Sequence, residues 1–205
     1  MTTMTDPREL MLHELKDIYY VEKALVRTLP QLSQEASDGE LRRGLRQHLG
    51  ETRKQVENLE KVFRALGERP AAEQCPGFDG IKQEHDEFMR EEQASPQVRD
   101  IFLTGAAART EHYEIAAYTS LIALARAIGE KECVTLLDRN LKQEKEALKK
   151  AESAGRRIAR ETAKSNGAGR SRSSRTGAGR STGSRAGAAR GRTGTGRTRT
   201  GSRSR

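Results

Sequence analysis

The sequence contains no tryptophan, only two cysteines and no long apolar run. Cys75 and Cys133 are too few for a disulfide framework, so a reduced, cytoplasmic setting is expected. No run of about eighteen apolar residues occurs, which excludes a membrane-spanning helix. Residues 1–6 have neither the basic start nor the apolar stretch of an export signal. We therefore expect a cytoplasmic protein without a membrane partner.

Acidic residues are also absent from the end of the chain. Residues 165–205 hold eleven arginines and no Lys, Asp or Glu, while the other 27 of the 38 basic residues and all 29 acidic residues lie in 1–164. The first part is thus net −2 and the second +11. The segment 165–205 has no aliphatic or aromatic residue larger than Ala to bury, so we expect a disordered tail. Its arginines are Arg170, Arg172, Arg175, Arg180, Arg185, Arg190, Arg192, Arg197, Arg199, Arg203 and Arg205.

Residues 1–164 show helical apolar periodicity nearly throughout, and no segment alternates with the period of a strand. Asp6-Pro7 and Ser95-Pro96 have the capping residue and proline that favour helix starts. Four long helices and one short helix, with one longer crossover, predict an all-α fold of the up-down bundle type over residues 1–164. The predicted helices are residues 7–36, 40–66, 80–91, 96–129 and 131–164.

Carboxylates occupy positions on the predicted core faces where apolar side chains are expected. No Lys or Arg shares these faces, and burial of an unpaired carboxylate costs several kcal/mol. The acids are therefore either largely protonated or hold cations, and two divalent ions would match the charge of four glutamates. Such acids with an imidazole are the ligands of di-iron or di-manganese sites. The residues are Glu22, Glu111, Glu114 and Glu144, together with His48 and, at the edge of its face, Glu51.

Five segments carry a family resemblance: residues 14–22 (ELKDIYYVE), 48–52 (HLGET), 80–84 (GIKQE), 111–118 (EHYEIAAY) and 140–145 (NLKQEK). Together they resemble the YciE/YciF family of ferritin-like bacterial stress proteins, over about residues 7–152. The resemblance implies a rubrerythrin-like four-helix bundle with a short extra helix in the crossover, a di-metal centre, and pairing as a homodimer. Glu111 and Glu114 look like the paired acids of the third rubrerythrin helix.

The chain departs from the usual ferritin-like pattern at two positions. Ferritin-like helices typically offer Glu-x-x-His twice, whereas position 54 is Lys and position 147 is Ala in this sequence. His48 and Glu51 have the reverse order, although residues three apart still share a helix face. A carboxylate-rich site with at most one imidazole is therefore expected.

Three further residues are candidates for a supporting role around the metal ligands. Asp17 and Thr52 are candidate hydrogen-bond partners of the ligands, because metal ligands usually need such support. Tyr118 lies one turn beyond Glu114. It is interpreted either as core packing or as a buried tyrosine that donates a hydrogen bond or relays an electron near the metals.

The favoured interpretation is a di-metal oxidoreductase of stress defence, holding two Fe or Mn ions and acting on peroxide. Iron oxidation fits the same residues. The arginines of 165–205 are expected to bind DNA or RNA through phosphates without sequence preference, which would make the protein nucleoid-associated. The alternative is a structural nucleic-acid-binding protein whose bundle is only an oligomerisation platform, and a third possibility is a bundle with neither activity. The expected metal ligands are Glu22, His48, Glu51, Glu111, Glu114 and Glu144.

Overall fold

The computed structural model describes residues 3–173, with side chains up to residue 166. Its helices are α1 (Pro7–Glu35), α2 (Gly39–Ala65), α3 (Pro76–Glu91), α4 (Pro96–Ala127) and α5 (Lys131–Ser173). The described part of the chain contains no strand, so the predicted all-α fold is confirmed. None of the helices in that part combines the length and the hydrophobicity needed to cross a membrane.

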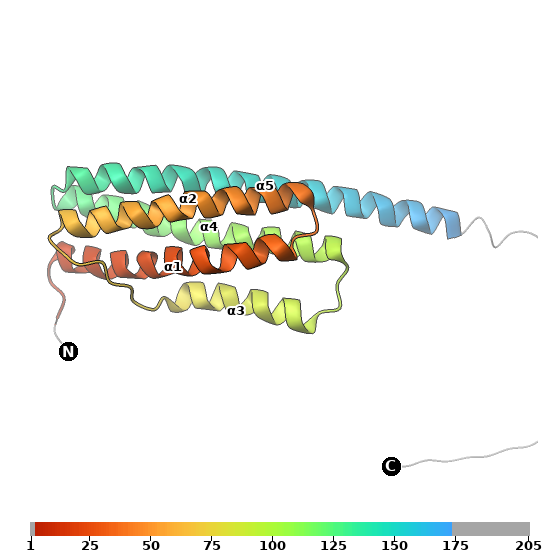
Figure 1. Ribbon diagram of the computed structural model, residues 1–205, viewed down its shortest axis with the longest axis horizontal. Helices are drawn as coiled ribbons and strands as arrows, with labels where there is room; N and C mark the ends of the chain where they lie inside the picture. Colours follow the sequence, from red (N-terminus) through yellow and green to blue (C-terminus); the bar gives the residue numbers. More distant parts are fainter. Residues whose placement is uncertain (1–2, 174–205) are drawn as a thin grey trace, which may run out of the picture. The chain divides into compact units, whose positions relative to one another are not determined.

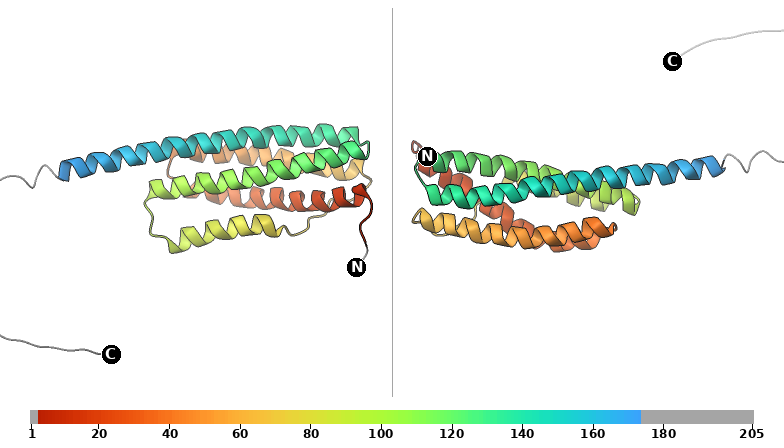
Figure 2. Two further views of the ribbon diagram at one scale, coloured as in Figure 1. Left: turned by 180° about the vertical axis from the view of Figure 1, so that it is seen from behind. Right: turned by 90° about the horizontal axis from the view of Figure 1, so that it is seen from above.

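Helices α1, α2, α4 and α5 lie side by side as a four-helix bundle, and α3 lies outside it, next to α1 and α4 (Figure 1, Figure 2). Helix α2 runs back along α1. The crossover that contains α3 then returns the chain to the end of the bundle where α2 begins, so α4 runs parallel to α2 (Figure 1). This is the ferritin-like arrangement, with the short extra helix in the crossover.

The helix starts follow the capping residues that the sequence offers. The Asp6 carboxylate accepts a hydrogen bond from the Arg8 amide at 2.8 Å, and Glu9 completes a capping box. Asp38 caps α2, and Ser95 caps α4 directly before Pro96. Two turns use glycine with positive φ, Gly67 at 74° and Gly129 at 82°, where other residues would be strained.

Two predicted boundaries were wrong. Helix α3 begins at Pro76 rather than Gly80, because proline at the first helical position needs no hydrogen-bond partner for its nitrogen. Helix α5 continues past Lys164 to Ser173, although Ile158 is the last buried residue described in it. The predicted tail 165–205 therefore begins inside a helix, and its remainder from residue 174 lies outside the described residues.

Asp100 of α4 fixes the turn between α1 and α2. Its buried carboxylate accepts hydrogen bonds from the Ser37 amide at 2.9 Å, from the Asp38 amide at 2.8 Å, and from the Ser37 hydroxyl. Arg157 of α5 reaches the same turn and donates two hydrogen bonds to the Asp38 carboxylate, at 3.0 and 2.7 Å. The sequence analysis missed this cluster, which ties all four bundle helices together at one end.

We expect Asp100→Ala to destabilise the protein by about 2–4 kcal/mol, because two amides and a hydroxyl would lose a buried carboxylate acceptor. Urea unfolding followed by circular dichroism measures the change. Asp138→Ala is the matched control, because Asp138 pairs with Lys142 one turn away on the surface. Equal stabilities of the two variants would contradict the role given to Asp100.

Candidate metal centre

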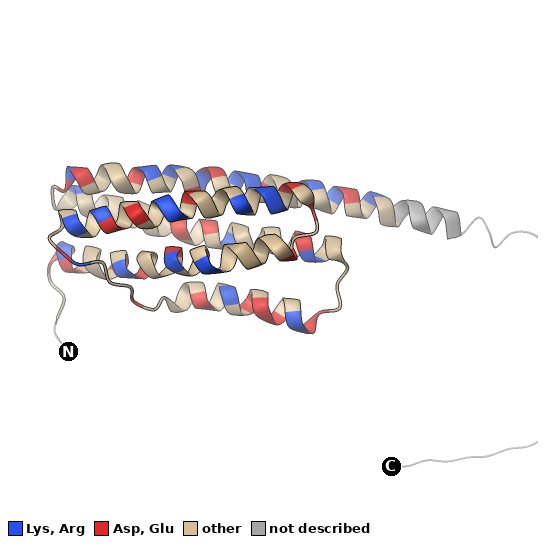
Figure 3. Cartoon of the chain, viewed as in Figure 1, with Lys and Arg blue, Asp and Glu red and all other residues tan. Residues whose placement is uncertain are grey.

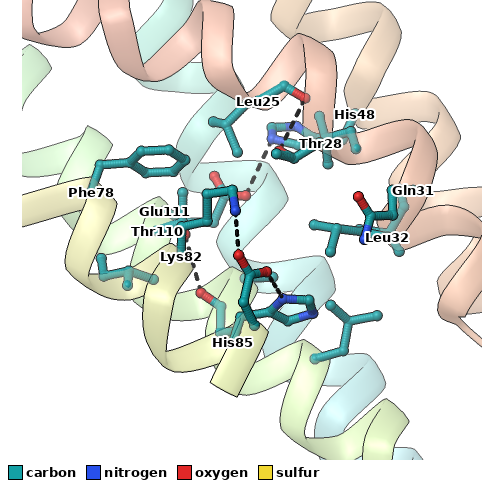
Figure 4. Close-up of a pocket in the computed structure, with 17 residues that line it drawn as sticks. Leu25, Thr28, Gln31, Leu32, His48, Phe78, Lys82, His85, Thr110 and Glu111 are labelled. Atoms are coloured by element: carbon teal, nitrogen blue, oxygen red, sulfur yellow. Dashed lines mark hydrogen bonds and ion pairs between the residues drawn. The ribbon is translucent and has the colours of Figure 1, made fainter. Parts of the chain in front are cut away.

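Four of the predicted ligands meet in the middle of the bundle. His48 comes from α2, Glu111 and Glu114 from successive turns of α4, and Glu144 from α5. One ligand atom from each of these residues lies within 4.8 Å of the others. The His48 Nε2 atom is 3.3 Å from Glu111 Oε1 (Figure 4). The described residues thus contain a histidine–carboxylate cluster whose geometry suits a metal ion.

Glu22 joins the cluster from α1. Its side chain is fully buried, and its Oε1 atom accepts a hydrogen bond from the Tyr118 hydroxyl. The negative charge of Glu22 contributes to the raised pKa of both Glu111 and Glu114, after the larger effect of burial. The glutamates that the sequence placed on core faces therefore lie together in the interior.

Glu51 differs from the other predicted ligands. Its side chain is 22% exposed; Oε2 lies 3.6 Å from His48 Nδ1 and Oε1 lies 3.8 Å from Lys150 Nζ. The pairing with His48, with smaller help from Gln47 and Lys150, lowers the pKa of Glu51 to about 2 despite partial burial. Glu51 is thus an ionised acid at the rim of the cluster, and Lys150 lies beside it.

Burial dominates the electrostatics of the inner acids. Desolvation is the largest cause of the raised pKa of Glu22, Glu111, Glu114 and Glu144, and repulsion from neighbouring acids adds to it at Glu22, Glu111 and Glu114. Without a cation, burial therefore favours the protonated form of these carboxyls. A divalent cation would replace those protons.

Several polar atoms in the cluster have no hydrogen-bond partner. Buried polar groups in proteins are nearly always paired, so a concentration of unpaired carboxylate oxygens at one point is a donor set that suits a cation. A metal ion or a pair of ions would coordinate these atoms, so the residues present fit the group that the fold implies. The atoms are Glu22 Oε2, Glu111 Oε2, both oxygens of Glu114, Glu144 Oε2 and His48 Nδ1.

Of the supporting residues predicted from the sequence, Tyr118 alone contacts a ligand side chain. Its buried hydroxyl donates to Glu22, which is the hydrogen-bonding alternative for this residue. Thr52 is buried but donates to the His48 carbonyl at 3.0 Å, within its own helix, because a hydroxyl can reach the carbonyl four residues back. Asp17 was wrongly placed: it lies among His13 and Glu73, outside the cluster.

Gln55 and Asn140 are the residues that the sequence analysis missed. Gln55 is fully buried and donates through Nε2 to Glu144 Oε1. Asn140 donates to the Tyr118 hydroxyl at 3.1 Å and to the Gln55 carbonyl at 3.3 Å. The signal was present, because Gln55 follows His48 by two helical turns and Asn140 precedes Glu144 by one. Both side chains are neutral amides, and a neutral amide on a core face is a much weaker sequence signal than a charged side chain.

The fold and the buried cluster define a ferritin-like bundle with a carboxylate-rich centre. Residues 6–164 match the family described as a domain of unknown function, DUF892, and the chain belongs to this family. The protein YciF of Escherichia coli strain K12 is 33% identical over 138 residues, which cover 67% of this chain and 82% of YciF.

Solved structures agree with this assignment. YcfI of Rhodopseudomonas palustris is 40% identical, with a TM-score of 0.70 over 72% of this chain and 94% of YcfI. The structure of the E. coli stress protein YciF is 30% identical, with a TM-score of 0.72 over 77% of this chain and 99% of the other. A protein of Xanthomonas campestris at 22% identity has a TM-score of 0.61 over 78% and 99%, which supports the fold alone.

We expect the metal-free protein to lose stability as the pH rises from 5.5 to 8. The inner acids have raised pKa values in the folded state, so the unfolded chain binds fewer protons above its ordinary glutamate pKa, and stability falls with pH. Each acid contributes at most about 1.4 kcal/mol per pH unit. Urea unfolding at several pH values measures the slope.

Two variants test which residues cause this slope. Glu114→Gln should make the slope shallower, because one titrating acid is removed. Glu51→Gln should leave it unchanged, since the lowered pKa of Glu51 acts only in more acidic solution. A metal-free wild-type protein whose stability rises over this range would contradict the electrostatic account.

Proposed function

We propose that the centre holds two divalent metal ions, Fe or Mn, and that the protein is an oxidoreductase of stress defence that reduces peroxide. The observation that carries the proposal is the group of unpaired carboxylate oxygens converging at one point. Four buried acids would carry a charge of −4 when ionised, which two divalent ions balance. The residues that would hold the ions are Glu22, His48, Glu111, Glu114 and Glu144, with Glu51 at the rim.

A bound pair of redox-active ions would supply the two electrons that reduce a peroxide. The protein side chains orient the ligands for this role. Tyr118 holds one oxygen of Glu22, and Gln55 holds one oxygen of Glu144, which leaves the second oxygen of each acid free for a cation. Asn140 connects these two supports, because it bonds both the Tyr118 hydroxyl and the backbone of Gln55.

Iron oxidation is the alternative reaction for the same centre. The name of E. coli YciF as a stress protein fits either chemistry. Two pockets reach His48 and Glu111: an apolar one from the side of α3, and one beside α5 that Glu40 and Glu51 also line. The second pocket admits small polar molecules such as hydrogen peroxide, and the first suits an uncharged apolar molecule better than a hydrated cation, so the pockets support peroxide as the substrate.

We expect protein expressed with ample iron or manganese to contain about two metal ions per chain and to consume hydrogen peroxide. Glu114→Ala and Glu144→Ala should each lower both quantities several-fold, because each removes an inner ligand. Glu146→Ala is the matched control, since Glu146 lies on α5 but pairs with Lys149 on the surface. Elemental analysis and a peroxide assay measure the outcome. Wild-type protein without metal, and no more active than Glu144→Ala, would contradict the proposal.

We further propose that the arginine-rich segment binds DNA or RNA. Its charge of +11 has no acid to oppose it, and arginine binds phosphates well. The helices of the bundle carry both signs of charge interspersed (Figure 3), consistent with the net −2 of residues 1–164. A purely structural role, which the name of the R. palustris relative suggests, requires this binding but no metal. Pairing as a homodimer stays a prediction.

Removal of residues 174–205 deletes nine of the eleven arginines and leaves the described helices intact. We expect the truncated protein to lose DNA binding but to keep its metal. For the full-length chain with about six phosphate contacts, log K plotted against log salt should have a slope of about −5, because bound phosphates release counterions. Fluorescence anisotropy over a salt series measures this. Undiminished binding by the truncated protein would contradict the proposal.

A further inference from the structure

A small pocket connects the surface beside α3 with the metal-binding cluster. It has a volume of about 80 Å³ and lies between α1, α3 and α4, with His48 of α2 at its inner end (Figure 4). The wall is made mainly of aliphatic and aromatic side chains, including Leu25, Leu29, Leu32, Phe78, Ile81 and Leu103.

The wall is less polar than its residue types suggest. Thr28 and Thr110 both line the pocket, but each hydroxyl lies 3.2 Å from a carbonyl oxygen of its own helix, to which it donates. At the mouth, the exposed Lys82 is paired with Asp86. Gln31 and His85 also line the pocket, and both are paired with acids. Gln31 donates to Glu35 Oε1 at 2.8 Å, and the His85 nitrogens lie 3.1 Å from Asp86 Oδ1 and 3.3 Å from Glu35 Oε2. With these polar groups paired, the middle of the pocket offers mainly apolar contacts.

The inner end has the opposite character. His48 and Glu111 line it and contact each other at 3.3 Å. Glu111 Oε2 is buried and has no hydrogen-bond partner, whereas His48 Nδ1 faces Glu51 Oε2 at 3.6 Å. A ligand that matches this pocket thus has an apolar body and a single polar end that points toward the cluster.

We propose that the pocket binds the alkyl group of an organic hydroperoxide and directs its O–O bond to His48 and Glu111. This inference rests on the proposed peroxide reduction. The O–O bond of ROOH would break, and ROOH, one water and two electrons would give ROH and two hydroxide ions; the divalent metal pair would supply the electrons, each ion going from +2 to +3. The alcohol keeps the alkyl group and is therefore a ligand of the same pocket.

Size and polarity select this class of substrate. A cavity of about 150 Å³ holds benzene, so a pocket near half that volume suits an alkyl group of a few carbons rather than a long lipid chain. A hydrated Fe²⁺ ion would lose water in the apolar middle without gaining ligands. Hydrogen peroxide is small enough to enter, but it gains nothing from the aliphatic wall.

The test uses tert-butanol, the unreactive product alcohol, with the full-length metal-free protein. Titration followed by NMR of labelled methyl groups should give saturable shifts at Leu29 and Ile81. Thr28→Leu adds bulk inside the pocket and should weaken this binding at least about tenfold. Thr135→Leu is the matched control, because Thr135 is exposed on α5 and bonds its own helix in the same way. Leu29→Ala enlarges the pocket and should shift preference toward cumyl alcohol.

Peroxide consumption by the metal-loaded proteins separates this inference from the proposed function. Thr28→Leu should lose consumption of tert-butyl hydroperoxide but keep that of hydrogen peroxide. If the wild type consumes hydrogen peroxide alone, or if Thr28→Leu binds tert-butanol as well as Thr135→Leu does, the pocket inference is overturned and peroxide reduction stands. If the metal-loaded wild type consumes neither peroxide, the proposed function fails and the substrate assignment fails with it.

Discussion

Burial of several carboxylates in one place, without a lysine or arginine among the inner acids, is the constraint on which the rest of this structure depends. Glu22, Glu111, Glu114 and Glu144 come from three helices and are buried close enough to affect one another electrostatically. Mutual repulsion and desolvation favour neutral acids there, and the proposed pair of cations would offset both penalties. The bundle must therefore be stable enough elsewhere to hold this centre together.

Three sets of contacts in the bundle provide that stability. Leucine-rich faces of α1, α2, α4 and α5 make one continuous core around it. At one end, Asp100 and Arg157 fix the α1–α2 turn to α4 and α5. Around the acids themselves, Tyr118, Asn140 and Gln55 provide hydrogen bonds that fix one oxygen of Glu22 and one of Glu144. Rigid supports of this kind leave the remaining oxygens directed at one point.

The helix pattern and the core acids were predictable, because apolar periodicity and an unpaired charge on a core face are local signals. The position of Glu144 on a core face, for example, could be predicted from the sequence of its own helix alone. The residues that support the ligands were harder to predict. Gln55 is neutral, so its burial contradicts no sequence pattern. Asp17 lies near His13 and Glu73 rather than near the ligands. The pocket beside α3 could not be predicted, since it depends on how the crossover helix docks against α1 and α4.

The most direct test of the central claim is anomalous X-ray diffraction from crystals of the metal-loaded protein, recorded at the absorption edges of iron and manganese. The account predicts two anomalous peaks about 3.5–4 Å apart, surrounded by Glu22, His48, Glu111, Glu114 and Glu144. Crystals grown with excess metal that show no peak among these residues, with the acids still buried and unpaired, would contradict it.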